Sequence, residues 1–172
     1  MAEEVKFGQV FVRAEKKQRG IILYPPNKDG GAVTVRFLGT QQQIYQVWNR
    51  YSRTYTCFEN KVEGASPRIV SFVIDRADEK VKAFICSRSV YQQLGESDSE
   101  HDFRIQRRGS GISTRYDVAS LGETVVSEDL LKRVEMTSET YPLTSIFINK
   151  VKWHLLEEEE QPITNRFDIL DL

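Results

Sequence analysis

Residues 68–86 read RIVSFVIDRADEKVKAFIC, and this stretch decides the fold class. Two β-branched and aromatic runs, 68–75 and 80–86, flank a short polar connection, which is the pattern of a β-hairpin. Further strand patterns follow in both directions along the chain. They lie at 6–13, 31–38, 44–50, 53–58, 102–108, 112–118 and 143–153. The sequence therefore predicts a mostly β protein.

Residues 31–38, GAVTVRFL, show how such a strand is oriented. Val33, Val35 and Phe37 share one face, because side chains alternate along a strand. Arg36 lies on the opposite face, which we expect to be the wet one. Short helices are predicted at 87–94, with Ser87 or Ser89 as N-cap, and at 127–134, with Ser127 as N-cap. These elements fit an OB-type five-stranded barrel with additional strands and one or two short helices, although alternation alone does not separate a barrel from a sandwich.

The charge of the chain is unevenly distributed. The net charge of −1 is the sum of two unlike parts. The C-terminal segment, 157–172, has six acidic residues and one arginine, whereas the part before it has a net charge of +4. We therefore predict one nucleic-acid-binding domain over residues 1–156 and an acidic, disordered tail over 157–172. The tail places apolar residues among acids, which suits capture by a partner protein. The predicted partner-binding residues are Glu157, Glu158, Glu159, Glu160, Phe167, Asp168 and Asp171.

Motifs of enzymes are missing from the sequence. There is no P-loop, no GxSxG elbow and no HExxH, and the two histidines have no obvious nucleophile partner. Cys57 and Cys86 predict two reduced, partly buried thiols, with no disulfide framework and no zinc site. We expect no catalysis, no cofactor and no metal. The longest apolar runs are too short for a membrane span and the N-terminus is acidic, so we expect a cytoplasmic protein.

Two stretches combine aromatic and basic side chains, which bind single-stranded nucleic acid by stacking on bases and neutralising phosphates. Residues 44–58 read IYQVWNRYSRTYTCF, and residues 103–118 read FRIQRRGSGISTRYDV. A continuous strand would place Tyr51, Arg53 and Tyr55 on one side. The predicted DNA-binding residues are Arg36, Tyr45, Trp48, Arg50, Tyr51, Arg53, Tyr55, Arg104, Arg107, Arg108, Arg115 and Tyr116. The alternative is that the aromatics fill the core and the arginines lie on a solvated face.

Three segments, in this order, resemble the single-stranded-DNA-binding replication proteins of tailed bacteriophages. They are VTVRFLG at 33–39, the hairpin at 71–84 running into SVY at 89–91, and FRIQRRGSG at 103–111 continuing to TRY at 114–116. The resemblance implies an OB-fold core with stacking aromatics and basic residues in a cleft. It also implies an acidic tail that recruits replication or recombination proteins in a host cytoplasm. Some members carry a zinc-binding insertion between the early strand and the hairpin. The corresponding interval here has a single cysteine, Cys57, and no cluster of zinc ligands.

We therefore expect a sequence-tolerant single-stranded DNA-binding protein of DNA replication, recombination or repair. It would protect exposed strands and recruit partners through its tail. The alternative is a protein-interaction module of the replication or transcription machinery that does not bind DNA directly. An RNA-binding OB module is a third reading, because no residue pattern here senses a 2′-hydroxyl and the choice of DNA follows from the resemblance.

Overall fold

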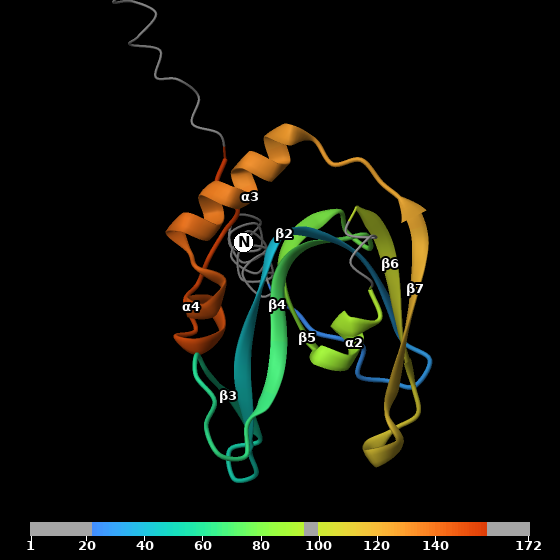
Figure 1. The fold of residues 1–172 in the computed structure, drawn as a ribbon, viewed down its shortest axis with the longest axis vertical. Coiled ribbons are helices and arrows are strands. Elements are labelled where there is room, and N and C mark those ends of the chain that lie inside the picture. The colour runs from blue at the N-terminus through green and yellow to red at the C-terminus, as the bar shows by residue number, and fades with distance from the viewer. Residues whose placement is uncertain (1–21, 95–99, 158–172) are drawn as a thin grey trace, which may run out of the picture.

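A computed structural model describes residues 22–94 and 100–157, and Figure 1 shows its ribbon. These residues are mostly β, as predicted. The strands are β1 (Ile22–Leu23), β2 (Ala32–Asn49), β3 (Thr54–Phe58), β4 (Ser66–Asp75), β5 (Lys80–Ser87), β6 (His101–Arg108) and β7 (Arg115–Glu123). The helices are α2 (Arg88–Gln92), α3 (Glu128–Thr140) and α4 (Leu143–Ile148), with a 3₁₀ turn, η2, at Gly111–Ser113. None of the described helices has the length and apolarity needed to span a bilayer. The strand predicted at 6–13 lies outside the described residues.

The strands form one seven-stranded mixed sheet. Its order is β1-β5-β4-β2-β6-β7, and β3 also pairs with β2. The β1–β5 pair is parallel and all other pairs are antiparallel. The sheet curls so that β6 and β7 lie across from β5, with α2 between them (Figure 1). In the described part of the chain, β5 and β7 form no ladder, and the sheet is not closed into a barrel.

The longest strand, β2, joins two segments that we predicted as separate strands, 31–38 and 44–50. The ladder with β4 continues across an irregularity between Leu38 and Gln42. Gly39 has a φ of 69° there, a left-handed conformation that glycine adopts without steric cost. The prediction of two strands was wrong because the polar run after Gly39 interrupts the hydrophobic alternation but not the backbone pairing. The edge of β2 away from β4 pairs first with β6 and then, nearer its end, with β3.

The inner face of the curled sheet encloses one hydrophobic cluster. Val33, Val35 and Phe37 point into it, which confirms the predicted alternation. The ring of Phe37 meets those of Phe84 and Phe103 edge to face, with centroid separations of 5.9 and 6.1 Å. This geometry is the one that aromatic quadrupoles favour. The inner cluster therefore ties the centre of β2 to β5 on one side and to β6 on the other.

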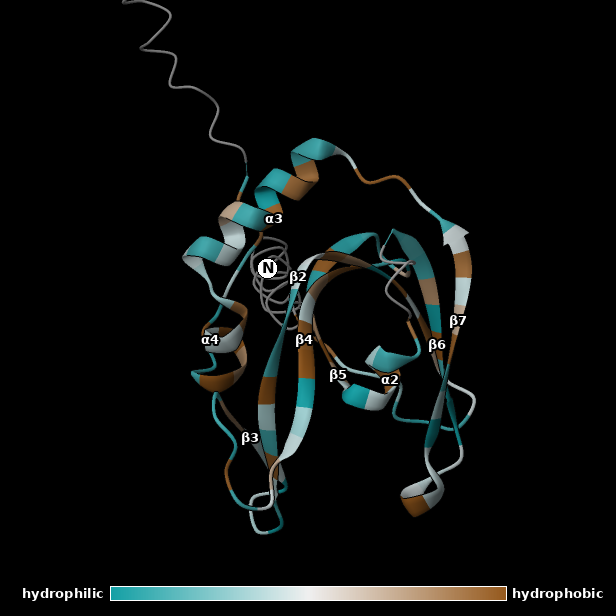
Figure 2. Cartoon of the chain, in the orientation of Figure 1, coloured by the Kyte–Doolittle hydropathy of each residue, from teal (hydrophilic) through white to brown (hydrophobic). Residues whose placement is uncertain are grey.

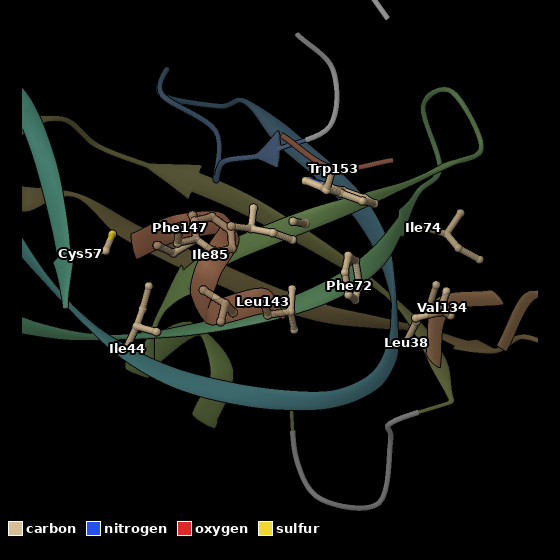
Figure 3. Packing of buried hydrophobic residues seen from close by; sticks show 13 residues of the cluster. Leu38, Ile44, Cys57, Phe72, Ile74, Ile85, Val134, Leu143, Phe147 and Trp153 are labelled. Carbon is tan, nitrogen blue, oxygen red and sulfur yellow. The ribbon is translucent and has the colours of Figure 1, made fainter. Parts of the chain in front are cut away.

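The outer face of the sheet carries a second cluster under α3, α4 and the segment that reaches Trp153 (Figure 3). Phe72 of β4 meets Trp153 with a ring-centroid separation of 5.0 Å. Because both faces are covered, the whole segment 69–75 of β4 is buried. Figure 2 shows β4 as hydrophobic over much of its length. Strands buried on both faces have such near-continuous apolar runs.

The strand predicted at 143–153 is instead helix α4 followed by an extended segment. Leu143, Ile146 and Phe147 are three and four residues apart, so a helix places them on one face, where all three are buried. Pro142 directly precedes the helix as its N-cap residue. The apolar run was read with the period of a strand, whereas the buried positions follow the period of a helix.

Both predicted helix starts are confirmed. The hydroxyls of Ser87 and Ser127 accept hydrogen bonds from the amides of Val90 and Leu130, at 3.3 and 3.2 Å. These contacts satisfy amide groups that have no partner within the helix. Helix α3 ends later than predicted, at Thr140.

The side chain of Gln93, directly after α2, bonds to the free edge of β7, where no neighbouring strand pairs in the described part of the chain. The amide of Gln93 donates to the carbonyl of Tyr116 at 3.0 Å. Its oxygen accepts from the amide of Val118 at 3.4 Å. These backbone groups belong to the edge of β7 that faces away from β6, so Gln93 satisfies them as a neighbouring strand would.

The two cysteines are free and buried. Cys57 belongs to the outer cluster and Cys86 to the inner one, so they lie on opposite faces of the sheet. Burial raises the pKa of the Cys86 thiol to about 12, from an ordinary value of 9.0. The folded protein therefore holds this thiol in its neutral form over a wide range of pH.

Replacing Cys86 with Ala should flatten the loss of stability at alkaline pH. Below pH 9 the thiol is protonated in both states, whereas above it only the folded state keeps the proton. In the unsubstituted protein this thiol should therefore lower the free energy of unfolding by about 1 kcal/mol per pH unit until the pH passes the folded pKa. The Cys86→Ala variant lacks this contribution. Denaturant titrations of both proteins at pH values above 9 would measure the two slopes. Equal slopes would contradict the expectation.

Candidate nucleic-acid interface

The β2–β3 hairpin turns at residues 50–53, between two strands that pair directly. The side chain of Asn49 accepts hydrogen bonds from the amides of Tyr51 and Ser52, at 2.9 and 3.2 Å. Arg53 has a φ of 54° at the end of the turn. The prediction that Tyr51, Arg53 and Tyr55 share one side of a continuous strand was therefore wrong. The reason is local, because an Asn side chain that bonds to amides two and three residues later favours a turn.

An aromatic pair lies near the end of this hairpin. Trp48 and Tyr55 are direct cross-strand partners, with ring centroids 4.7 Å apart. They are 47% and 48% exposed, and Tyr51 in the turn is fully exposed. Alternation places Trp48 on the same face as the buried Ile44, so the hairpin carries the pair past the end of the outer cluster. The rings are thus held by a strand ladder and are accessible to a ligand.

The other predicted residues of the hairpin occupy different environments. Arg50 and Arg53 are exposed in the turn. Tyr45 is half-buried and pairs with Phe58 on the opposite face of the hairpin from Trp48. Its hydroxyl accepts a hydrogen bond from Gln43 at 2.9 Å. The structure therefore groups Trp48, Tyr55 and the turn, and separates Tyr45 from them.

A groove of about 580 Å³ lies beside this hairpin. The hairpin contributes Gln46, Thr54, Tyr55 and Cys57, the sheet contributes Ile22 and Ile85, and Tyr24 lies directly after β1. Helix α4 and the segment after it contribute Ile146, Phe147, Lys150, Val151 and Lys152. We did not predict Tyr24, Lys150 or Lys152 as site residues. Only the tertiary fold brings them to the hairpin, and a Tyr-Pro-Pro turn or two alternate lysines is too common in sequences to identify a site.

The thiol of Cys57 does not add charge to the groove. Burial raises the pKa of Cys57, while the hydrogen bond from Gln46 and the nearby Arg68 and Lys150 act in the opposite direction. The net shift is upward, so the thiol is neutral at pH 7. Among the described residues, no group of three or more His, Cys, Asp or Glu side chains could hold a metal ion.

The β6–β7 hairpin extends toward the same end of the molecule as the β2–β3 hairpin (Figure 1). Arg104, Arg108 and Arg115 are exposed on it. Arg108 pairs with Arg115 in the ladder and forms an ion pair with Asp117. The η2 turn at its end has a hydrophobic band in Figure 2, where Ile112 is fully exposed. This hairpin therefore presents cations beside an apolar turn.

Arg107 and Tyr116 are half-buried and bind protein groups. The guanidinium of Arg107 donates to Thr114 Oγ1 at 3.1 Å and to the carbonyl of Pro26 at 3.5 Å. The hydroxyl of Tyr116 donates to the same carbonyl at 3.4 Å. These bonds attach the segment before β2 to the β6–β7 hairpin. Both residues therefore have a stabilising role that their sequence pattern did not reveal.

Arg36 is not on an exposed face, and that prediction was wrong. Its side chain is only 7% exposed. Its guanidinium donates to Thr124 Oγ1 at 3.0 Å, to the Thr124 carbonyl at 3.2 Å and to the Phe37 carbonyl at 2.7 Å. The segment that follows β7 covers this part of β2, and strand alternation could not predict that cover. Arg36 is thus removed from any DNA contact surface.

The acidic tail falls almost wholly outside the described residues. Glu157 is exposed, and the remaining predicted partner-binding residues lie beyond it. A scan against protein-family models and searches of curated proteins and of solved structures found no match to this chain.

Proposed function

We propose that this protein binds single-stranded DNA without strong sequence preference, as a non-catalytic protein of DNA replication, recombination or repair. The observation that carries the proposal is the β2–β3 hairpin, where the half-exposed Trp48–Tyr55 pair lies beside an exposed turn with Tyr51, Arg50 and Arg53. Exposed aromatic rings stack on any base, and arginines neutralise the phosphates between bases. No bond is made or broken.

We also propose that the curled sheet is an OB-type barrel that is incompletely closed. Strands β2, β4, β5, β6 and β7 would be its five strands, with α2 between the third and the fourth. Oligonucleotides bind OB folds at the face of the second and third strands and at the loops between strands one and two and between four and five. On this assignment the β2–β3 hairpin and the turn of the β6–β7 hairpin would take those two loop positions. Since α3 and α4 cover the outer face of β4 and β5, the hairpins would provide most of the contact.

Binding of a fluorescent oligo-dT of about 30 nucleotides, followed by anisotropy across a salt series, tests the proposal. Four exposed arginines, Arg50, Arg53, Arg104 and Arg115, would give a slope of log affinity against log salt of about −3, since each phosphate contact on a single strand contributes about −0.7. Duplex DNA should compete poorly, because its bases are already stacked.

Removal of residues 157–172 provides a second arm of the same experiment. The segment carries a net charge of −5, so its loss should leave DNA affinity unchanged or raise it. No binding of oligo-dT at low salt, with or without the tail, would overturn the proposal. Equal affinity for oligo-U would leave strand binding intact and overturn the choice of DNA over RNA.

A further inference from the structure

The groove beside the β2–β3 hairpin has an apolar floor and polar edges. Ile85, Ile146 and Phe147 form the floor together with Cys57. Figure 3 shows Phe147 of α4 close to Ile85, at the same end of the outer cluster as Cys57. Tyr24 and Tyr55 add aromatic surface that is 59% and 48% exposed. A volume of about 580 Å³ lies within the range of small-molecule sites, which are apolar with a few fixed polar groups.

The charges of this groove differ from those of three other grooves in the described part of the chain. Its described lining contains Lys150 and Lys152 and no carboxylate. The three other grooves are lined by carboxylates. The first contains Glu79, the second contains Glu135, and the third contains several carboxylates, among them Asp102. Two lysines without a nearby acid in the lining attract an anion. The groove therefore fits a ligand with a flat apolar part and a negative part.

The backbone at Lys150 supports a role for its side chain. Lys150 follows Asn149, the C-cap residue of α4, and has a φ of 53°. Glycine is the usual residue at this position after a helix, because a side chain in the left-handed region is strained. Strained conformations of non-glycine residues cluster at functional sites. This conformation therefore holds a lysine, where a glycine would be unstrained, at the edge of the groove.

We propose that this groove binds one nucleotide of the strand, with its base against Tyr24 and Tyr55 and its phosphate at Lys150 and Lys152. This inference rests on the proposed function and adds a defined pocket to it. The base would bury its ring on the apolar floor, and the lysines would neutralise the backbone. Trp48 and Tyr51, the other exposed rings of the hairpin, would then stack on neighbouring bases.

The orientation of Gln46 gives the pocket a preference among bases. Arg68 Nε lies 3.2 Å from Gln46 Oε1, and since a guanidinium only donates, this contact fixes the side-chain amide. Gln46 Nε2 therefore faces Cys57 Sγ, at 3.9 Å, and keeps a second hydrogen for a ligand. A donor suits the O4 carbonyl of thymine, whose methyl group suits the floor, whereas the bidentate contact of a glutamine with adenine N6 and N7 would need the Gln46 oxygen that already accepts from Arg68. The pocket should prefer thymine over adenine.

Titration of the full-length protein with thymidine 5′-monophosphate and, separately, with 2′-deoxyadenosine 5′-monophosphate tests the pocket. Binding is followed by the NMR chemical shifts of the backbone amides. Dissociation constants in the millimolar range are expected for a single nucleotide, with shifts centred on Tyr55, Phe147 and Lys150. The thymidine nucleotide should bind about fivefold more tightly, as one net hydrogen bond would give. Gln46→Glu keeps the acceptor for Arg68 but removes the donor, so the ratio of the two affinities should fall to one or below.

The Lys150→Gly variant separates binding from folding. It removes a charge and relieves the left-handed strain, so nucleotide affinity should fall about fivefold while the melting temperature rises by about 2 °C. Lys132→Gln, on the exposed face of α3, is the matched control and should change neither quantity. A purely structural role for Lys150 would leave nucleotide affinity unchanged.

The outcomes distinguish the pocket from the proposed function. Oligo-dT binding that is unaffected by Lys150→Gly and Lys152→Ala, with no shifts from the mononucleotides, would overturn the pocket and leave strand binding intact. Nucleotide binding without any oligo-dT binding would overturn strand binding, and with it a pocket for one nucleotide of a strand. Binding of both, with weakening of both by Lys150→Gly, supports the pocket.

Discussion

Replacing both Trp48 and Tyr55 with Ala is expected to weaken oligo-dT binding by about 30- to 1,000-fold. Each base stacked on an aromatic ring contributes about 1–3 kcal/mol. The two rings are in contact, with centroids 4.7 Å apart, so their effects should be less than additive. A loss of about 2–4 kcal/mol corresponds to the stated range. Anisotropy titrations at one fixed salt concentration would measure it.

Two sets of controls separate the loss of an aromatic face from the effect of substitution in general. Tyr55→Phe and Trp48→Phe keep an aromatic face and should retain most of the affinity. Val125→Ala removes a side chain that is 95% exposed and lies outside both hairpins, and it should have no effect. Thermal unfolding of the double variant should change little, since a cross-strand aromatic pair contributes about 0.5–1.5 kcal/mol. Unchanged affinity in the folded double variant would show that the hairpin is not the DNA site.

Replacing Arg36 with Met is expected to destabilise the protein by about 3 kcal/mol and to leave its DNA affinity unchanged. Its guanidinium satisfies the buried carbonyl of Phe37 and two oxygen atoms of Thr124. Methionine fills part of the same space but leaves the buried Phe37 carbonyl without this donor, which costs about 1–3 kcal/mol, and it also removes the part-buried bonds to Thr124. The melting temperature should fall by about 10 °C.

Arg104 is the matched control for Arg36. It lies on β6, paired with Thr34 of β2, and is exposed. Arg104→Met should change stability by less than about 0.5 kcal/mol and should reduce the salt dependence of DNA binding by one phosphate contact. If Arg36→Met weakened DNA binding while stability stayed the same, the structural role assigned to Arg36 would be wrong.

Local sequence patterns predicted those parts of the fold that depend on local chemistry. The inward face of Val33, Val35 and Phe37 follows from strand alternation. The helix starts at Ser87 and Ser127 follow from capping chemistry. The errors arose where distant residues decide the outcome. Thr124, far along the chain, covers Arg36, and no local pattern contains that contact.

The candidate site was predictable only where it depends on local sequence. The interleaving of aromatic residues and arginines around Trp48 and Tyr55 indicated a binding segment. It could not show that Asn49 starts a turn and thereby places the two rings opposite each other. The contribution of Lys150 depends on α4 packing beside the hairpin, and α4 itself was read as a strand.

The β2–β3 hairpin has a further consequence for how this chain can change over evolutionary time. No residue in the segment 47–56 is fully buried, and the last hairpin residues in the outer cluster are Ile44 and Cys57. Sequence and length of that segment can therefore vary with little penalty in folding free energy. In this segment the residues proposed to contact DNA are not core residues, so mutation can change the ligand preference of the hairpin tip while the scaffold stays intact.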